Sequence, residues 1–92
     1  MKAYRPERVS KEIMRAISEV IREEVSDPRL QDIIVLDVEI TKDLKKAEIF
    51  YTLIKEEEKI AEILEKAKGF IRKKIAERIE LKYVPEIYFT RR

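Results

Sequence analysis

Residues 65–78 read EKAKGFIRKKIAER and contain Gly69, the only glycine of the 92-residue chain. Apolar residues recur at helical spacing on both sides of this glycine. At about 100° per residue, however, the centre of the apolar stripe after Gly69 lies roughly 70° around the axis from the centre before it. A straight helix would not bury both halves against one flat partner. The sequence therefore predicts two helices, or one sharply kinked helix, meeting at Gly69.

Two explanations account for this glycine, which costs a helix about 1 kcal/mol relative to alanine. Gly69 packs closely against a neighbouring element, or it marks a functional break whose backbone amides and flanking cations meet an anionic ligand. The distribution of charge favours the second explanation. Residues 66–82 hold seven basic and two acidic residues, a net charge of +5, whereas the whole chain carries only +2.

The composition restricts the classes of function. The length is that of one domain, residues 1–92. No run of the chain approaches the roughly 20 apolar residues of a membrane span, and no signal peptide is recognisable, so we expect a cytoplasmic protein without membrane contact. Cysteine and histidine are absent. Disulfides, thiolate or imidazole metal sites and the usual catalytic triads are therefore excluded, and we expect no enzyme, cofactor, metal or small-molecule substrate.

The polar residues point to a thermophilic source. Charged residues make up 43% of the chain, asparagine is absent and Gln31 is the only glutamine. This pattern is typical of proteins in which ion-pair networks replace thermolabile amides. Mixed surface charge is expected in such a chain, so the segregation of charge near residues 66–82 is more informative than the total.

The first half of the chain predicts a helix and a hairpin. Residues 9–25 form an amphipathic helix that Asp27-Pro28 ends. Residues 34–41 alternate with period two, which predicts a strand whose buried face consists of Ile34, Leu36, Val38 and Ile40. Residues 47–53 alternate likewise and complete an antiparallel hairpin. Asp37, Glu39, Asp43 and Glu48 could be metal ligands, but alternation with the apolar residues explains Asp37, Glu39 and Glu48 better as a solvated sheet face.

The second half predicts the glycine-bearing helix and a last strand. Glu56–Glu58 occupy the opening of the helix, where carboxylates favour the positive end of the dipole. Ile87 and Phe89 lie on one face of a short strand after Pro85. The fold class is α+β, a three-stranded mixed sheet with helices on one face, and we expect the order 3-1-2 with strand three parallel to strand one. This arrangement is similar to a K-homology domain of bacterial type II, a module that clamps single-stranded RNA at a glycine-bearing helix junction.

Six segments, in this order and spacing, resemble the ribosome-binding factor A family. They are RPERV (5–9), DPRL (27–30), VEITKDL (38–44), AEIFY (47–51), AKGFIR (67–72) and LKYVPEIYF (81–89). The resemblance runs along nearly the whole chain. It implies a K-homology-like fold in which an Ala-x-Gly interruption, here Ala67 to Gly69, replaces the usual Gly-x-x-Gly loop. It also implies a protein that binds the small ribosomal subunit and its rRNA, acts in late maturation and processing of 16S rRNA, and has a role in cold adaptation. We expect the protein to be a monomer.

The expected RNA-binding residues lie in the basic segment. They are Lys66, Ala67, Lys68, Gly69, Arg72, Lys73, Arg78 and Lys82. The cations would contact phosphates, which position a protein without reading sequence, while Ala67 to Gly69 shape the approach to the backbone. The alternative is a protein-interaction or structural module whose basic residues serve only solubility, and salt-sensitive binding to RNA separates the two. A small phosphatase ranks third, because it would need an anion cradle and a positioned catalytic group.

Overall fold

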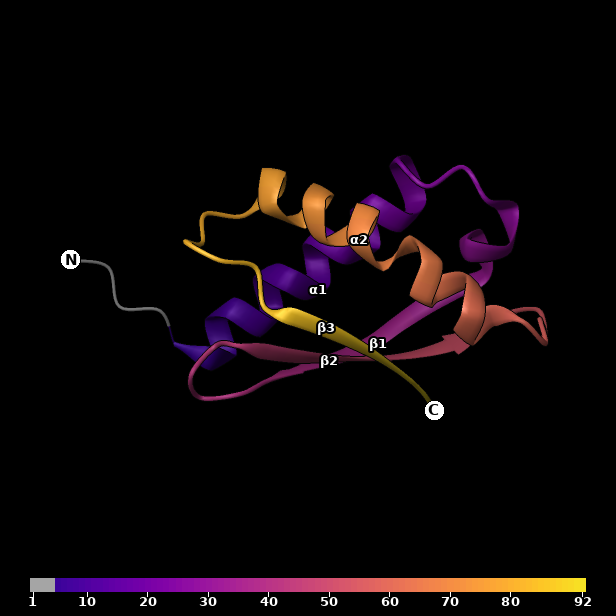
Figure 1. The fold of residues 1–92 in the computed structure, drawn as a ribbon. Coiled ribbons are helices and arrows are strands. Elements are labelled where there is room, and N and C mark those ends of the chain that lie inside the picture. Colours follow the sequence, from indigo (N-terminus) through magenta and orange to yellow (C-terminus); the bar gives the residue numbers. More distant parts are fainter. Residues whose placement is uncertain (1–4) are drawn as a thin grey trace.

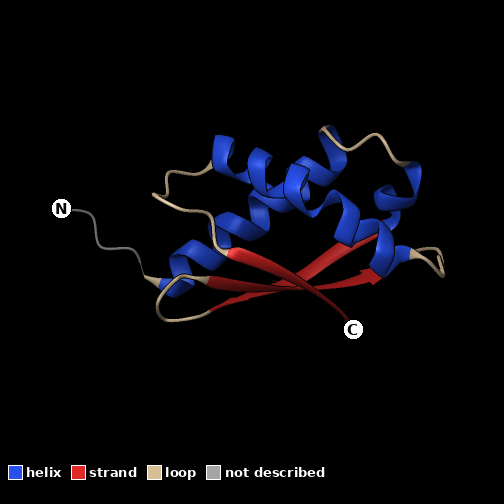
Figure 2. Cartoon of the chain, in the orientation of Figure 1, coloured by secondary structure: helices blue, strands red, loops and turns tan. Residues whose placement is uncertain are grey.

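The computed structural model describes residues 5–92, so residues 1–4 of the predicted domain lie outside the described part. Its elements follow the predicted order: α1 (Pro6–Glu23), the 3-10 helix η1 (Pro28–Asp32), β1 (Ile33–Ile40), β2 (Lys46–Leu53), α2 (Ile60–Arg78) and β3 (Glu86–Arg91). Both long helices lie on one face of the sheet (Figures 1 and 2). The predicted α+β fold with a mixed three-stranded sheet is confirmed.

Helix α1 forms because its apolar residues repeat every three or four positions. This stripe is buried, and its members are Val9, Ile13, Ala16, Ile17, Val20 and Ile21. Pro6 occupies the first turn, where its missing N–H is no loss. After the helix, the Asp27 carboxylate accepts a hydrogen bond from the Arg29 backbone N–H at 2.9 Å and caps η1. The helix therefore ends close to the predicted Asp27-Pro28 turn.

The order of the strands differs from the prediction. β1 pairs antiparallel with β2, β2 pairs parallel with β3, and the sheet order is β1-β2-β3. The expected order 3-1-2, with strand three parallel to strand one, is wrong. A strand–helix–strand connection returns the chain parallel to the strand that it left, which here is β2. Because β1 already occupies one edge of β2, β3 pairs with the other edge.

A bulge in β1 changes which residues face the core. The register with β2 shifts between Val35 and Asp37, so an extra residue is inserted at this point. Val38 is buried as predicted, but Ile34 and Leu36 are each 43% exposed. The predicted buried face is therefore correct only after the bulge. Before the bulge, the residues that were predicted to face solvent face the core instead.

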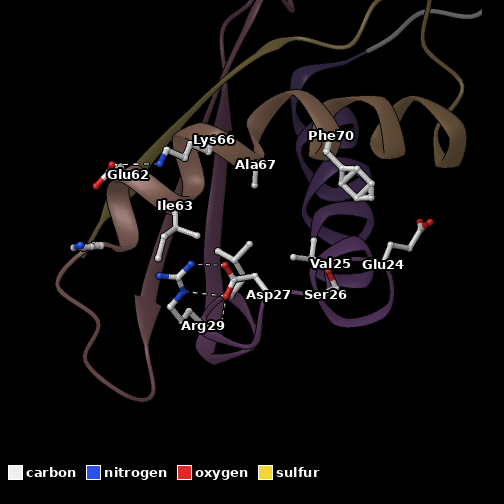
Figure 3. Close-up of a pocket in the computed structure, with 12 residues that line it drawn as sticks. Glu24, Val25, Ser26, Asp27, Arg29, Glu62, Ile63, Lys66, Ala67 and Phe70 are labelled. Carbon is white, nitrogen blue, oxygen red and sulfur yellow. Dashed lines mark hydrogen bonds and ion pairs between the residues drawn. The ribbon is translucent and has the colours of Figure 1, made fainter.

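The glycine-bearing segment is one continuous helix (Figure 1), so of the two predicted alternatives the pair of helices is wrong and the single helix that changes direction holds. Its ribbon changes direction midway (Figure 1), between the labelled residues Ala67 and Phe70 (Figure 3). The two halves bury their apolar residues in different places. The first half belongs to a cluster of Leu30, Tyr51, Ile60, Ile63 and Leu64. The second half places Ile71 and Ile75 in the larger cluster with α1 and the sheet, which explains the drift of the apolar stripe.

The acidic run before α2 does not open the helix, contrary to the prediction. The helix begins only at Ile60. Glu57 accepts a hydrogen bond from the Lys59 N–H at 3.0 Å, in the turn before the helix. Glu56 instead binds the Arg91 guanidinium with two hydrogen bonds of 2.8 and 2.6 Å, which connects this loop to the end of β3.

Candidate nucleic-acid interface

The solvent side of α2 combines two lysines with the glycine. At about 100° per residue, Lys66, Gly69 and Lys73 fall on the side opposite the buried stripe, and all three are exposed. The Lys66 ammonium lies 3.5 Å from the Glu62 carboxylate of the same helix, but its side chain is 78% exposed. Lys73 makes no ion pair within residues 5–92. Together these three residues form the solvent face of α2.

Gly69 has no structural requirement for its lack of a side chain. A Cβ atom at this position would meet nothing within 4 Å. The residue is helical and does not have a positive φ angle. The close-packing explanation for this glycine is therefore wrong within the described part of the chain. An exposed helical glycine leaves the backbone open to close approach by another molecule.

A second group of basic residues points toward β3 and the loop before it. The Lys68 ammonium lies 2.9 Å from Glu65 and 5.4 Å from the centre of the Tyr88 ring. Arg72 donates to the carbonyl oxygens of Val84 at 2.8 Å and Pro85 at 3.2 Å. Since those carbonyls belong to the α2–β3 loop, Arg72 fixes that loop against the helix. The observed contacts of Arg72 are therefore structural.

The third group lies against α1. Arg78 binds Glu24 at 2.8 Å, Glu19 at 3.1 Å and Glu23 at 3.8 Å. Lys74 binds Glu24 at 3.3 Å. We call these five residues the ionic seam. The hydrogen bond from Arg78 lowers the pKa of the Glu24 carboxyl below its usual value, and Lys74 adds to the effect.

The predicted RNA-binding residues therefore do not form one patch. Lys66, Gly69 and Lys73 share the solvent face. Ala67 is half-buried and packs against both apolar clusters. Lys82 lies beyond the helix, with its ammonium 5.6 Å from the centre of the Tyr83 ring.

Two exposed aromatic residues lie near these cations and were not among the predicted RNA-binding residues. Phe70 is next to Gly69, and Tyr83 follows Lys82. Both side chains are exposed to solvent. The signal that could have found them is the aromatic residue interleaved with basic ones, which is typical of surfaces that bind single-stranded nucleic acid.

A cleft of about 550 Å³ lies between the end of α1, η1 and the first half of α2 (Figure 3). Ile63 and Ala67 contribute apolar surface, and Phe70 lies at one end. Most charges at its rim are already paired: Asp27 binds Arg29 at 2.8 Å, and Lys66 pairs with Glu62. The cleft thus offers mainly apolar contact beside the solvent face.

Two of the acidic residues that were considered as metal ligands, Asp43 and Asp37, have other partners. Asp43 accepts hydrogen bonds from the Thr41 hydroxyl at 2.6 Å and the Lys45 N–H at 3.0 Å. Asp37 accepts from the Val38 N–H at 2.8 Å. Within residues 5–92, no group of three acidic side chains is placed to hold a metal ion. No helix in the same range is long and apolar enough to cross a membrane.

Comparisons with known proteins all point to one family. The family model described as Ribosome-binding factor A matches residues 5–91. Ribosome-binding factor A of Enterococcus faecalis is 41% identical over 95 residues, which cover 99% of this chain and 82% of that protein.

A crystal structure and a homology model fitted into a cryo-EM map have the same fold. The crystal structure of ribosome-binding factor A from Thermus thermophilus superposes with a TM-score of 0.85 at 25% identity, over 96% of this chain and 97% of that one. A Thermus thermophilus homology model fitted into a cryo-EM map of a 30S–RbfA complex superposes with a TM-score of 0.77 at 26% identity, over 88% of each chain. This likeness confirms the predicted K-homology-like class of the fold.

Proposed function

Because the chain belongs to the ribosome-binding factor A family, we propose that it is a non-enzymatic assembly factor that binds the small ribosomal subunit and its rRNA. It acts during late maturation of that subunit and in the processing of 16S rRNA. The known complex of a relative with the 30S subunit supports this choice of partner. The protein works in the cytoplasm as a monomer, and its role in cold adaptation belongs to the same proposal.

The observation that carries the proposal is the solvent face of α2. Lys66 and Lys73 present ammonium groups on either side of Gly69, about one helical turn from it in each direction. Exposed lysines contact phosphates without reading sequence. The glycine between them lets a ribose–phosphate backbone approach the helix more closely than any side chain would permit.

The other basic residues of the segment hold this face in position. Arg72 fixes the α2–β3 loop, and the ionic seam joins the last turn of α2 to α1. A preorganised surface does not have to be ordered when it binds, which lowers the entropy cost of association. Lys68, directed toward β3, and Lys82, in the α2–β3 loop, are further candidate phosphate contacts outside this face.

A second candidate is a protein-interaction module, and one observation favours it. The bulge leaves Ile34 and Leu36 exposed on β1, which is an edge strand of the sheet. Exposed apolar residues on an edge strand suit contact with another protein chain. Such a contact would not depend on the lysines of the solvent face of α2. Binding to a protein chain should therefore change little with salt, whereas binding to rRNA should weaken, and this difference distinguishes the two candidates.

Co-sedimentation of the protein with purified small subunits tests the proposal, with large subunits as the control. If about four phosphates are neutralised, binding should weaken roughly a hundredfold between about 50 and 200 mM salt. A preference for the small subunit together with this salt dependence supports the proposal. Equal binding to both subunits, or none, would contradict it.

A further inference from the structure

A second cleft lies at the end of the molecule where two loops meet. The β1–β2 hairpin and the α2–β3 loop lie at the same end of the fold (Figure 1) and line a space of about 490 Å³. Its apolar lining comes from Leu44, Leu81 and Val84. The two loops are joined directly, because the Glu86 N–H donates to the Lys45 carbonyl at 2.8 Å.

Tyr83 stands at this cleft in an unusual environment for a large aromatic side chain. It is 76% exposed, more than any other large apolar or aromatic residue within the described range. The loop beside it is nevertheless held firmly. Arg72 donates to the carbonyls of Val84 and Pro85, and Pro85 itself is buried. The ring is therefore presented to solvent by a fixed backbone rather than by a free loop.

Two lysines lie at this cleft, and one of them is beside the ring. The Lys82 ammonium lies 5.6 Å from its centre, and Lys45 lines the cleft from the hairpin. The nearby Asp43 carboxylate is occupied by the Thr41 hydroxyl and the Lys45 N–H. An exposed aromatic face next to ammonium groups is the arrangement on which single-stranded nucleic acids stack a base while lysines hold the adjoining phosphates.

We propose that this cleft binds one unstacked base of single-stranded RNA, stacked on Tyr83, with the neighbouring phosphates held by Lys82 and Lys45. The inference rests on the proposed function, since it adds a base contact to a protein that otherwise contacts phosphates. An apolar protein surface docked on Leu44, Leu81 and Val84 would leave the ammonium groups of Lys45 and Lys82 without an anionic partner, so such a partner fits less well than RNA.

Tyr83→Trp provides a direct reporter, because the chain contains no tryptophan. Titration with a short single-stranded oligoadenylate should quench its fluorescence in a saturable manner, as a stacked base does. An oligonucleotide of the same length with abasic sites should bind more weakly and should not quench. Absence of saturable quenching, or equal quenching by the abasic strand, would overturn the stacking contact.

Affinity measured by anisotropy of the labelled oligoadenylate completes the test. Tyr83→Ala should weaken binding by about 5- to 150-fold, the range for loss of one stacked base, whereas Tyr83→Phe should keep wild-type affinity. Ile54→Ala is the matched control, since Ile54 is 71% exposed in a different loop. Thermal midpoints of all variants should stay close to wild type, because the substituted side chains are exposed.

The outcomes separate this inference from the proposed function. If Tyr83→Ala binds the oligoadenylate like wild type, the base contact is refuted, while a small-subunit preference in co-sedimentation still supports the assembly factor. If Tyr83→Ala loses affinity for the small subunit only, the cleft binds a protein component and the RNA inference fails. If wild type lacks the small-subunit preference, the proposed function itself fails.

Discussion

Basic residues lie on two sides of α2, and their interactions differ between the two sides. On the side facing α1, Arg78 and Lys74 bind the Glu24 carboxylate at 2.8 and 3.3 Å. On the solvent side, Lys66 pairs only with a carboxylate of its own helix, and Lys73 has no ion pair within residues 5–92. A basic segment in sequence is therefore not a patch of free charge in space. Of these two sides of α2, only the solvent side is available to phosphates.

The difference matters for stability as well as for binding. Surface ion pairs contribute little when they are isolated, but the ionic seam connects two helices through several carboxylates that share two cations. The solvent face makes no ion pair or hydrogen bond with another element within residues 5–92. Substitutions on one side should therefore change unfolding, and substitutions on the other should change RNA binding.

The largest effect on stability should come from the buried stripe of the same helix. Ile71 is fully buried two residues after Gly69. Ile71→Ala should lower the free energy of unfolding by about 2–5 kcal/mol, because it removes apolar contacts and leaves a cavity. Chemical denaturation measures this loss. A loss of unfolding free energy as small as that caused by an alanine substitution at an exposed position would contradict the conclusion that the buried stripe positions α2.

The ionic seam should give the next largest effect. Arg78→Ala leaves Glu19, Glu23 and Glu24 near one another without their main cation, so the thermal midpoint should fall by several degrees. Lys73→Ala, on the solvent face, is the matched control and should leave the midpoint almost unchanged. Equal shifts of the thermal midpoint in the two variants would show that the ionic seam contributes no more to stability than the solvent face does.

Gly69→Ala should have a smaller effect of opposite sign. The added methyl group meets no atom, and alanine favours the helix by about 1 kcal/mol. The variant should therefore be more stable than wild type by up to that amount, yet bind small subunits more weakly because the methyl group lies on the solvent face. Unfolding and co-sedimentation are measured on the same preparation. Gained stability with unchanged binding would remove Gly69 from the interface.

The smallest predicted effect is a pH dependence. The pKa of Glu24 is lowered by its hydrogen bond with Arg78 and by Lys74. The pair therefore stabilises the fold above the unfolded-state pKa of roughly 4, and this contribution is lost as the pH falls through the lower folded-state pKa. Glu24→Gln should lower the thermal midpoint at neutral pH, and the difference from wild type should vanish in acid.

Glu39→Gln serves as the control for this pH dependence, because Glu39 makes no ion pair within the described residues. Its thermal midpoint should follow that of wild type across the range. A difference between wild type and Glu24→Gln that stays constant with pH would show that Glu24 acts through packing rather than charge.

Local sequence patterns predicted the elements well, because they depend on near neighbours. The spacing of apolar residues located α1, the hairpin, the glycine-bearing helix and β3. The bulge escaped detection because Ile34 and Leu36 continue the alternation of Val38, and an inserted residue leaves no trace in such a pattern. The strand order could not be predicted in the same way, because no local pattern shows which edge of β2 is free to pair with β3.

The same limit explains the errors around α2. A single glycine costs about 1 kcal/mol, which is less than the packing of Ile71 and its buried neighbours contributes, so the helix continues through Gly69. Arg78 looked like a phosphate contact because its partners are distant in sequence: Glu24 and Glu19 precede it by 54 and 59 residues. Charge counts along the chain do not reveal such pairs.

The salt dependence of small-subunit binding by Lys66→Ala/Lys73→Ala tests the role of the solvent face most directly. Each lysine should contribute about tenfold to affinity. The slope of log affinity against log salt should become shallower by about 0.7–0.9 for each lysine removed. Lys11→Ala/Lys55→Ala, which removes two exposed lysines elsewhere, should keep the wild-type slope. If Lys66→Ala/Lys73→Ala also binds with the wild-type affinity and slope, the solvent face of α2 does not bind rRNA.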